Sequence, residues 1–179
     1  MGNTKRRISK RYLWGWNILI FVTTGSRKFQ FDRLIKKLDE LVEERKLTEE
    51  IFVQIAETQY IPKNFRYKRY LNPDEFKQKQ QNASLIISHA GTGALISALK
   101  MNKQVIAVPR YARFNEHSDD HQIQISEMLE KEGYLRVVYD IGDLGDVIKE
   151  AYEHPIVKQY NKPSNVIPLI IQHIQDWNL

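Results

Sequence analysis

The chain contains no cysteine, which excludes disulfide bonds and thiolate metal sites. It also lacks a long apolar run near its start: Ile18–Val22 is far shorter than the roughly 20 residues that span a membrane. The small-residue cleavage pattern of a secretory signal peptide is missing there as well. With 179 residues, of which 42% are hydrophobic, the chain is long enough for one domain with a full core. A cytoplasmic protein is therefore expected.

Acidic residues are absent before Asp32, whereas five basic residues lie between positions 5 and 11. Without these five, 22 basic residues balance 22 acidic ones, so the net charge of +5 belongs to the N-terminal end. We therefore divide the chain into a basic N-terminal extension, 1–16, and one domain, 17–179. Trp14 and Trp16 would suit a membrane interface, or the segment is simply an upstream extension. No surface of mixed aromatic and basic residues follows, so nucleic acid is not an expected partner.

Apolar, strand-like segments alternate with segments whose apolar residues recur three and four positions apart. Because several strand segments are apolar throughout, the pattern predicts a parallel sheet with helices on both faces, an α/β, Rossmann-like fold. Strands are expected at 17–24, 51–56, 65–70, 85–88, 105–108 and 136–139, and helices at 31–42, 73–82, 94–101, 119–131, 143–153 and 165–177.

A glycine-rich turn, residues 88–93 (Ser-His-Ala-Gly-Thr-Gly), joins one such strand to the next helix. Unpaired N–H groups at a helix N-terminus attract anions, and the glycines Gly91 and Gly93 let a phosphate approach them, with the Thr92 hydroxyl as a further donor. The turn is neither a Walker loop nor a full GxGxxG motif, because position 96 is Ile. Tight strand–helix packing is the alternative role. His89 either contacts the ligand or fixes the loop by hydrogen bonds.

A polar cluster, residues 116–122 (Glu-His-Ser-Asp-Asp-His-Gln), follows a later strand. Carboxylates and amides bind sugar hydroxyls, and Asp120 and Gln122 are the expected ligands. Its histidines and acids also suggest a metal, but the spacing of residues 119–121 does not converge on one ion, so neither a metal nor another cofactor is expected. Ser118 or Asp119 could instead cap the following helix.

These two segments and residues 23–26 all follow strands, and ligands of parallel sheets bind at the carboxyl ends of the strands. Basic residues at 27–28, 110 and 113 could neutralise phosphate there, face solvent or meet an acidic partner. A catalytic base is not evident. His89 and Glu116 are the candidates in this chain, and a partner subunit is the alternative source.

Residues 21–26, 29–34, 88–93, 105–110 and 116–122, in this order, resemble the carboxyl-terminal domain of glycosyltransferase family 28. That family includes the donor domain of MurG and the catalytic subunit of the dolichol-pathway N-acetylglucosaminyltransferase. The similarity is greatest to the catalytic subunits of bacterial capsule and exopolysaccharide glycosyltransferases. The resemblance covers roughly residues 18–153.

The resemblance implies one half of a GT-B fold that binds a UDP-sugar. A separate membrane-anchored subunit would bind a lipid-diphosphate-linked saccharide, and the pair would work at the inner face of the plasma membrane. The implied reaction is an inverting, β-1,4-type hexosyl transfer. Galactose is the expected hexose, with glucuronate and N-acetylglucosamine as alternatives. The implied binding residues are Gly91, Thr92 and Gly93 for the diphosphate, Asp120 and Gln122 for the sugar, and Thr24 and Gly25 at the border.

The chain departs from the family pattern at one position. Relatives hold the ribose hydroxyls with a glutamate in the helix after the glycine turn, and here Ser97 occupies its place. Ribose binding would then weaken or move, for example to Glu116. This departure and the missing base leave one rival open, a non-catalytic nucleotide-sugar-binding regulatory subunit. A UDP-sugar epimerase of the same overall architecture is a further alternative.

Overall fold

The structure is a computed structural model, and it describes residues 18–161. The expected extension 1–16 and the expected closing helix 165–177 lie outside this range. Within 18–161, the helices are too short or too polar for any of them to cross a membrane.

Six parallel strands form one sheet in the order β3-β2-β1-β4-β5-β6. The strands are β1 (Leu19–Thr23), β2 (Glu50–Gln54), β3 (Arg66–Lys68), β4 (Leu85–Ser88), β5 (Gln104–Ala107) and β6 (Arg136–Val137). This confirms the predicted parallel α/β sheet. The two outermost strands are shorter than predicted. At one edge β3 has three residues, all of them exposed, and at the other edge β6 has only two residues.

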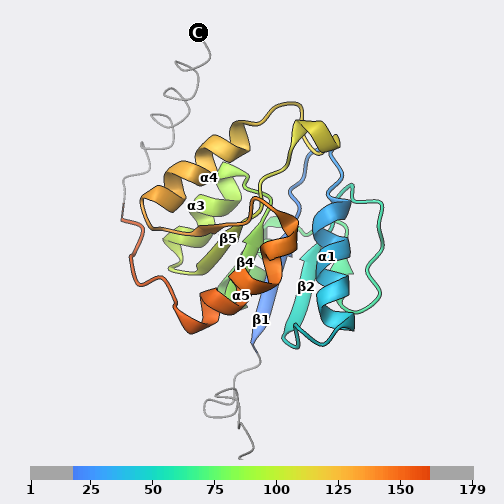
Figure 1. The fold of residues 1–179 in the computed structure, drawn as a ribbon, viewed down its shortest axis with the longest axis horizontal. Coiled ribbons are helices and arrows are strands. Elements are labelled where there is room, and N and C mark those ends of the chain that lie inside the picture. Colours follow the sequence, from blue (N-terminus) through green and yellow to red (C-terminus); the bar gives the residue numbers. More distant parts are fainter. Residues whose placement is uncertain (1–17, 162–179) are drawn as a thin grey trace, which may run out of the picture.

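Helices cover both faces of the sheet (Figure 1). They are α1 (Asp32–Glu43), α2 (Pro73–Asn82), α3 (Thr92–Lys100), α4 (His121–Lys131) and α5 (Leu144–Glu153), with short 3-10 turns η2 (Ala112–Phe114) and η3 (Ile141–Asp143). Successive strand residues point to opposite faces. In β1, Ile20 and Val22 join the core under α1 and α5, whereas Phe21 joins the core under α3 and α4.

Local sequence explains where two of the helices begin. Asn72 caps α2 in a capping box with Glu75, and Pro73 occupies the first turn, as predicted. Helix α3 begins at Thr92, two residues before the predicted Ala94. Gly91 is its N-cap residue, so the glycine-rich turn itself forms the first turn of the helix.

The strand order reverses direction at β1 and β4, because the chain builds outward to β3 on one side and to β6 on the other. At such a switch point the connections leave in opposite directions and open a crevice beyond the strand ends. Thr23 ends β1 and Ser88 ends β4, and the two residues are partners in the sheet. The segments predicted to bind ligand follow directly from these ends.

Candidate functional site

A cleft of about 740 Å³ opens at the carboxyl ends of β1 and β4. It brings together the loop after β1, the glycine-rich turn and the start of α4, three segments that the sequence analysis placed at one sheet edge. The cleft is lined by Thr23, Gly25, Ser26, Arg27, Gln54, Leu71, Pro73, Phe76, Lys77, Gln80, His89, Gly91, Thr92, Gly93, Ala94, Ser97, Met101, Arg110, His117, His121 and Gln122.

The imidazole of His89 lies between Gly25 and Gly91 at the floor of the cleft. A Cβ atom at Gly91 would lie 2.3 Å from Nε2 of His89, and one at Gly25 would lie 2.8 Å from the same atom. Gly25 also has a φ of +94°, which residues with a side chain rarely adopt. Both glycines are therefore required for the histidine to lie between the two loops.

His89 is a neutral imidazole of defined tautomer. Its Nδ1 lies 3.3 Å from the carbonyl oxygen of Thr23, and because a carbonyl only accepts, Nδ1 must carry the proton. Nε2 then holds a lone pair. Burial, with the nearby Arg110 cation as a second cause, lowers the pKa of His89 to about 3. The ring is therefore a hydrogen-bond acceptor at Nε2 but a weak base.

Gln54 fixes the loops on the other side of β1. Its Nε2 donates to the carbonyl of Gly25 (2.9 Å), and its Oε1 accepts from the backbone N–H of Leu71 (3.1 Å). The Thr24 hydroxyl donates to the backbone carbonyl of Gln54 (3.2 Å). One buried amide thus holds the loop after β1 against the segment that leads into α2.

Gln122, in the first turn of α4, presents a polarised amide to the cleft. Its Oε1 accepts from the backbone N–H of Arg110 (3.2 Å) and lies 3.4 Å from Nε of the same residue. Because the oxygen is held in this way, the NH₂ group is the end left for a ligand. An amide that donates suits the oxygen atoms of sugar hydroxyls.

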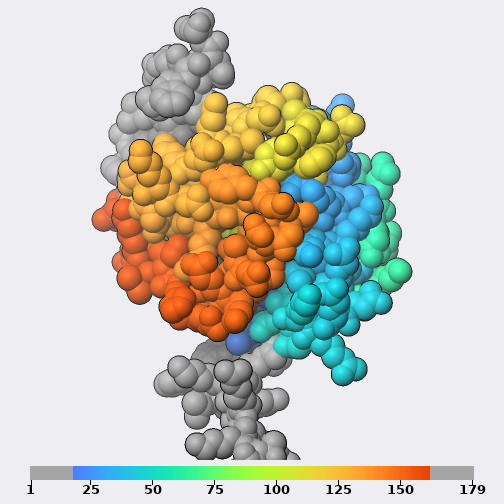
Figure 2. Space-filling model, in the orientation of Figure 1, coloured from blue at the N-terminus to red at the C-terminus, as the bar shows by residue number. Residues whose placement is uncertain are grey.

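Glu116 lies outside the cleft lining, in a buried ion pair with Arg33 of α1. The two guanidinium–carboxylate contacts are 3.0 Å (Nε–Oε1) and 2.9 Å (Nη2–Oε2), and the Tyr111 N–H donates to Oε2 (3.1 Å). Figure 2 shows the segment around residue 115, in yellow, lying directly against the blue segment at the start of α1. Every oxygen of this carboxylate is therefore engaged by protein groups that attach the loop to α1.

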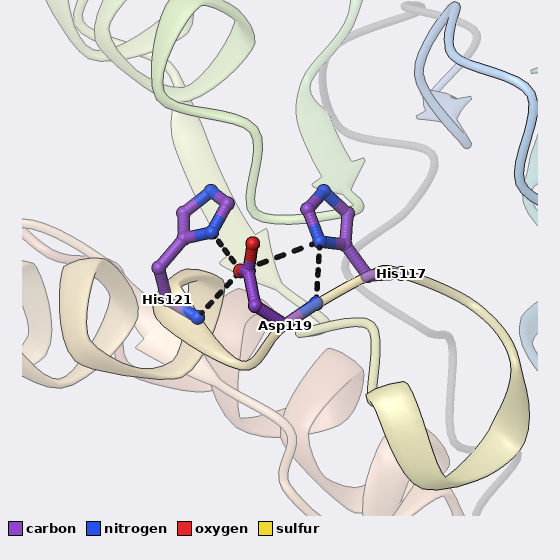
Figure 3. Close-up of side chains that lie close together, drawn as sticks. All are labelled: His117, Asp119 and His121. Atoms are coloured by element: carbon purple, nitrogen blue, oxygen red, sulfur yellow. Dashed lines mark hydrogen bonds and ion pairs between the residues drawn. The ribbon is translucent and has the colours of Figure 1, made fainter.

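Three potential metal ligands gather at the rim, on His117, Asp119 and His121, and their ligand atoms lie within 4.8 Å of one another. Both rings turn one nitrogen toward the Asp119 carboxylate and the other nitrogen away from it (Figure 3). The His117 Nδ1 also accepts from the Asp119 N–H (3.3 Å). His121 makes a very short contact with the same carboxylate. The adjacent residues 119–121 did not indicate this grouping, because its members alternate along the chain.

Six of the predicted binding residues line the cleft, namely Gly25, His89, Gly91, Thr92, Gly93 and Gln122. Three others, Thr24, Glu116 and Asp120, do not. Asp120 is exposed, and its Oδ1 accepts from the Ala112 N–H (3.0 Å), which ties the η2 turn to α4. The assignments of these nine residues to parts of a ligand stay predictions.

No cleft role was predicted for Gln54 or Gln80, and none was chosen for Arg110. Ser97, which stands where relatives have a ribose-binding glutamate, also lines the cleft. Gln80 is buried in α2 and accepts the Ser97 hydroxyl hydrogen bond (2.8 Å) across to α3. No sequence signal separates Gln80 from the other polar residues of α2, because only the structure shows that it is the buried one. For Gln54, the signal was a glutamine at the carboxyl end of an apolar strand.

Comparison with known proteins identifies the family to which this sequence belongs. The family model described as glycosyltransferase family 28 C-terminal domain matches residues 19–174. The Mus musculus protein named UDP-N-acetylglucosamine transferase subunit ALG13 is 30% identical over 124 residues, which are 64% of this chain and 10% of that protein. The Yarrowia lipolytica protein of the same name is 35% identical over 72 residues, 40% of this chain and 35% of that protein. The chain thus spans a minor part of the length of these relatives.

Solved glycosyltransferases share the fold. MurG of Acinetobacter baumannii matches with a TM-score of 0.55 and 16% identity, over 88% of this chain and 50% of that chain. Os79 from O. sativa, solved in complex with UDP, matches with a TM-score of 0.57 and 13% identity, over 78% of this chain and 32% of that chain. The fold is therefore that of one half of a GT-B glycosyltransferase. By its sequence match over most of its length, the chain belongs to the family of glycosyltransferase family 28 C-terminal domains.

Proposed function

We propose that this domain is the donor-binding, catalytic half of a two-component inverting glycosyltransferase. It would bind a UDP-sugar in the cleft and transfer the hexose to a lipid-diphosphate-linked saccharide held by a separate membrane-anchored subunit. The relatives in Mus musculus and Yarrowia lipolytica carry the name of a transferase subunit, which supports a two-part enzyme. The extent of the match to MurG, half of that chain, supports the same division.

The observation that carries the proposal is the shared cleft of the glycine-rich turn and Gln122. Thr92 and Gly93 open α3, so their backbone N–H groups belong to the unpaired amides of a helix N-terminus, which suit a diphosphate. The NH₂ group of Gln122 suits a sugar hydroxyl. Leu71 and Phe76 give one part of the lining an apolar character that suits a nucleobase.

The proposed reaction needs one base and one stabilised leaving group. The acceptor hydroxyl oxygen forms a bond to the anomeric carbon and loses its proton to a base. The bond from that carbon to the diphosphate oxygen breaks, and its electron pair stays on the diphosphate. Among residues 18–161, the cleft lining contains no carboxylate. His89 has a pKa of about 3, and Glu116 is bound by Arg33, so we assign the base to the partner subunit.

Donor, pathway and location follow from the same proposal. Galactose is the proposed hexose, and capsule or exopolysaccharide synthesis the proposed process. The pair would assemble at the cytoplasmic face of the plasma membrane, where a lipid-linked acceptor is available. Glucuronate and N-acetylglucosamine are the alternative donor sugars, and a panel of UDP-sugars separates the three.

Isothermal titration calorimetry with UDP tests the proposal most directly. UDP should bind to the domain, and Gln122→Ala should weaken UDP-galactose binding more than UDP binding, because Gln122 is assigned to the sugar. Gln124→Ala, the same substitution on the same helix but outside the cleft lining, is the matched control. Absence of UDP binding at millimolar concentration, with the partner subunit present, would count decisively against the proposal.

The described part of the chain places no carboxylate in the cleft lining, which favours one rival, a non-catalytic subunit that only binds a nucleotide-sugar. Reconstitution of the two subunits separates the readings. If the transfer rate is unaffected by Gln122→Ala, the domain is regulatory. Turnover of free UDP-N-acetylglucosamine without any lipid acceptor would instead identify an epimerase.

A further inference from the structure

The charged side chains that line the cleft are all positive. Within the described range 18–161, its lining includes Arg27, Lys77 and Arg110 but neither aspartate nor glutamate. Arg27 and Lys77 are exposed, so solvent screens their charge. Arg110, with 1% of its surface exposed, is among the largest fully buried side chains. The cleft therefore has a buried cation in its wall.

The hydrogen bonds of this guanidinium are long, and their acceptors are neutral. Nε lies 3.4 Å from Oε1 of Gln122, and Nη1 lies 3.5 Å from the carbonyl oxygen of Thr24. Both distances exceed the 2.7–3.2 Å that is usual for N–H···O bonds. The guanidinium carbon also lies 5.8 Å from the centroid of the Phe29 ring, which is another uncharged contact. A buried charge is costly unless it is paired and well hydrogen-bonded, so Arg110 lacks the anionic partner that its burial requires.

The carboxylate that acts on Arg110, that of Glu116, does not supply this partner. Glu116 accepts two hydrogen bonds from Arg33 and one from the backbone of Tyr111. Burial lowers the pKa of Arg110 to about 10, Arg27 acts in the same direction, and Glu116 opposes them only as the smallest influence. Because Arg33 already neutralises Glu116, the positive charges of Arg27 and Arg110 are not balanced by a carboxylate of their own.

Arg110 also lies near the turn that was assigned to the diphosphate, through the loop after β1 that borders the cleft. Its Nη1 contact is to Thr24, the residue before Gly25, and Gly25 and Gly91 lie on the His89 ring. By contrast, the neighbouring Arg113 is exposed and is not part of the cleft lining. Of the two arginines in this loop, only Arg110 can meet a ligand in the cleft.

We infer that Arg110 binds the diphosphate of the nucleotide-sugar from the side opposite the backbone N–H groups of Thr92 and Gly93. This assignment rests on the proposed function, because it takes a nucleoside diphosphate as the ligand. The guanidinium offers several donors in a plane and keeps its charge, which suits phosphate oxygens. The same group would hold the negative charge that the diphosphate gains as the hexose leaves.

Calorimetry with three ligands tests this assignment, namely UDP, uridine and inorganic pyrophosphate. Arg110→Gln should weaken UDP and pyrophosphate binding by about 30-fold, the size expected from losing charge-assisted hydrogen bonds, and leave uridine within about twofold. Arg113→Gln, three positions further along the same loop, should change none of the three. Urea unfolding should show that Arg110→Gln is folded, because the variant removes an uncompensated buried charge.

Unchanged UDP binding in Arg110→Gln, or equal losses for UDP and uridine, would overturn the assignment. Arg110→Lys keeps a charge without the planar donors, and it serves if the glutamine variant does not fold: partial loss for UDP alone supports the assignment, and no loss opposes it. A wild-type domain that binds pyrophosphate through Arg110 but not UDP would refute the proposed donor while preserving the anion site. A domain that binds neither would refute both.

Discussion

Gly91 and His89 are in direct contact, with no room between them for a single carbon atom. A Cβ atom at Gly91 would lie 2.3 Å from Nε2 of the ring, whereas one at Gly93 would meet nothing within 4 Å. These two glycines of one turn therefore have different roles. Gly91 admits the histidine beneath the turn, and Gly93 lies where the turn is open.

Gly91→Ala should destabilise the domain by about 1–3 kcal/mol, because the added methyl group must displace a buried ring. Gly93→Ala should be neutral or stabilising, since alanine is favoured over glycine in a helix by about 0.5–1 kcal/mol. Urea unfolding measures both. The double variant His89→Ala/Gly91→Ala should recover much of the loss of the single glycine variant, and strict additivity would contradict the assigned contact.

The pH dependence of stability should report on His89. Its pKa is about 3 in the folded state, against 6.5 for the ordinary residue, so the unfolded chain binds a proton that the folded chain refuses. Nothing is lost above pH 6.5, and stability falls as the pH drops from 6.5 toward 3. His89→Gln should remove this contribution, which amounts to about 2 kcal/mol between pH 7 and pH 5. If the free energy of unfolding, measured with urea, depends on pH in the same way for wild type and variant over that interval, the histidine is accessible to protons in the folded state.

Replacement of Glu116 distinguishes a structural carboxylate from a ribose ligand. Glu116→Gln should cost about 3 kcal/mol of stability, since it leaves Arg33 without its buried partner, and should leave UDP affinity within about twofold. Glu44→Gln, at an exposed pair with Lys46, should change neither quantity. Weakened binding of UDP with normal stability and unchanged binding of 2′-deoxy-UDP would restore Glu116 as the ribose ligand.

Ser97→Glu should strengthen nucleotide binding. Ser97 lines the cleft and donates to Oε1 of Gln80, so the longer carboxylate can reach further into the cleft than the hydroxyl. Two ribose hydroxyls donating to a charged acceptor should raise UDP affinity by about tenfold and 2′-deoxy-UDP affinity by less. Ser97→Ala, measured by the same calorimetry, should change the ratio of the two affinities little. An equal gain for both nucleotides would place the ribose elsewhere.

Chelators should not affect UDP binding. Arg27, Lys77 and Arg110 already supply positive charge to the cleft, so a diphosphate has no need of a divalent cation there. We expect the dissociation constant for UDP to agree within about twofold with and without EDTA. A large loss in EDTA, restored by Zn²⁺ in wild type but not in Asp119→Asn, would instead establish a metal at the His117–Asp119–His121 cluster.

The fold was predictable from the sequence because its signals are local. The apolar strands and the glycine turn can each be recognised from a short stretch of sequence. Only the order in which the strands pair within the sheet depends on the rest of the chain. The predicted lengths of the two edge strands were too great. An edge strand such as β3 pairs with one neighbour only and has no buried face, so its sequence pattern extends beyond the residues that pair. The predicted meeting of residues 23–26, 88–93 and 116–122 at one edge is confirmed by the shared cleft.

The roles of individual polar residues were less predictable, because they depend on partners distant in sequence. Glu116 and Arg33 are separated by 83 positions, and nothing near either residue indicates the pair. Arg110 and Arg113 look equivalent in the sequence, yet one is buried in the cleft wall and the other is exposed. A carboxylate or a cation in a promising loop becomes a ligand only where the fold leaves it unpaired.

Gln54 uses both ends of one amide, donating to the carbonyl of Gly25 and accepting from the N–H of Leu71. A carboxylate of the same length would repel the first partner, and an ammonium or aliphatic group would fail the second. Asparagine is too short by one methylene to span both. At the end of β2, therefore, only glutamine satisfies both partners, although this side chain touches no catalytic atom. The positions of the loop after β1 and of the segment before α2 both depend on that one residue.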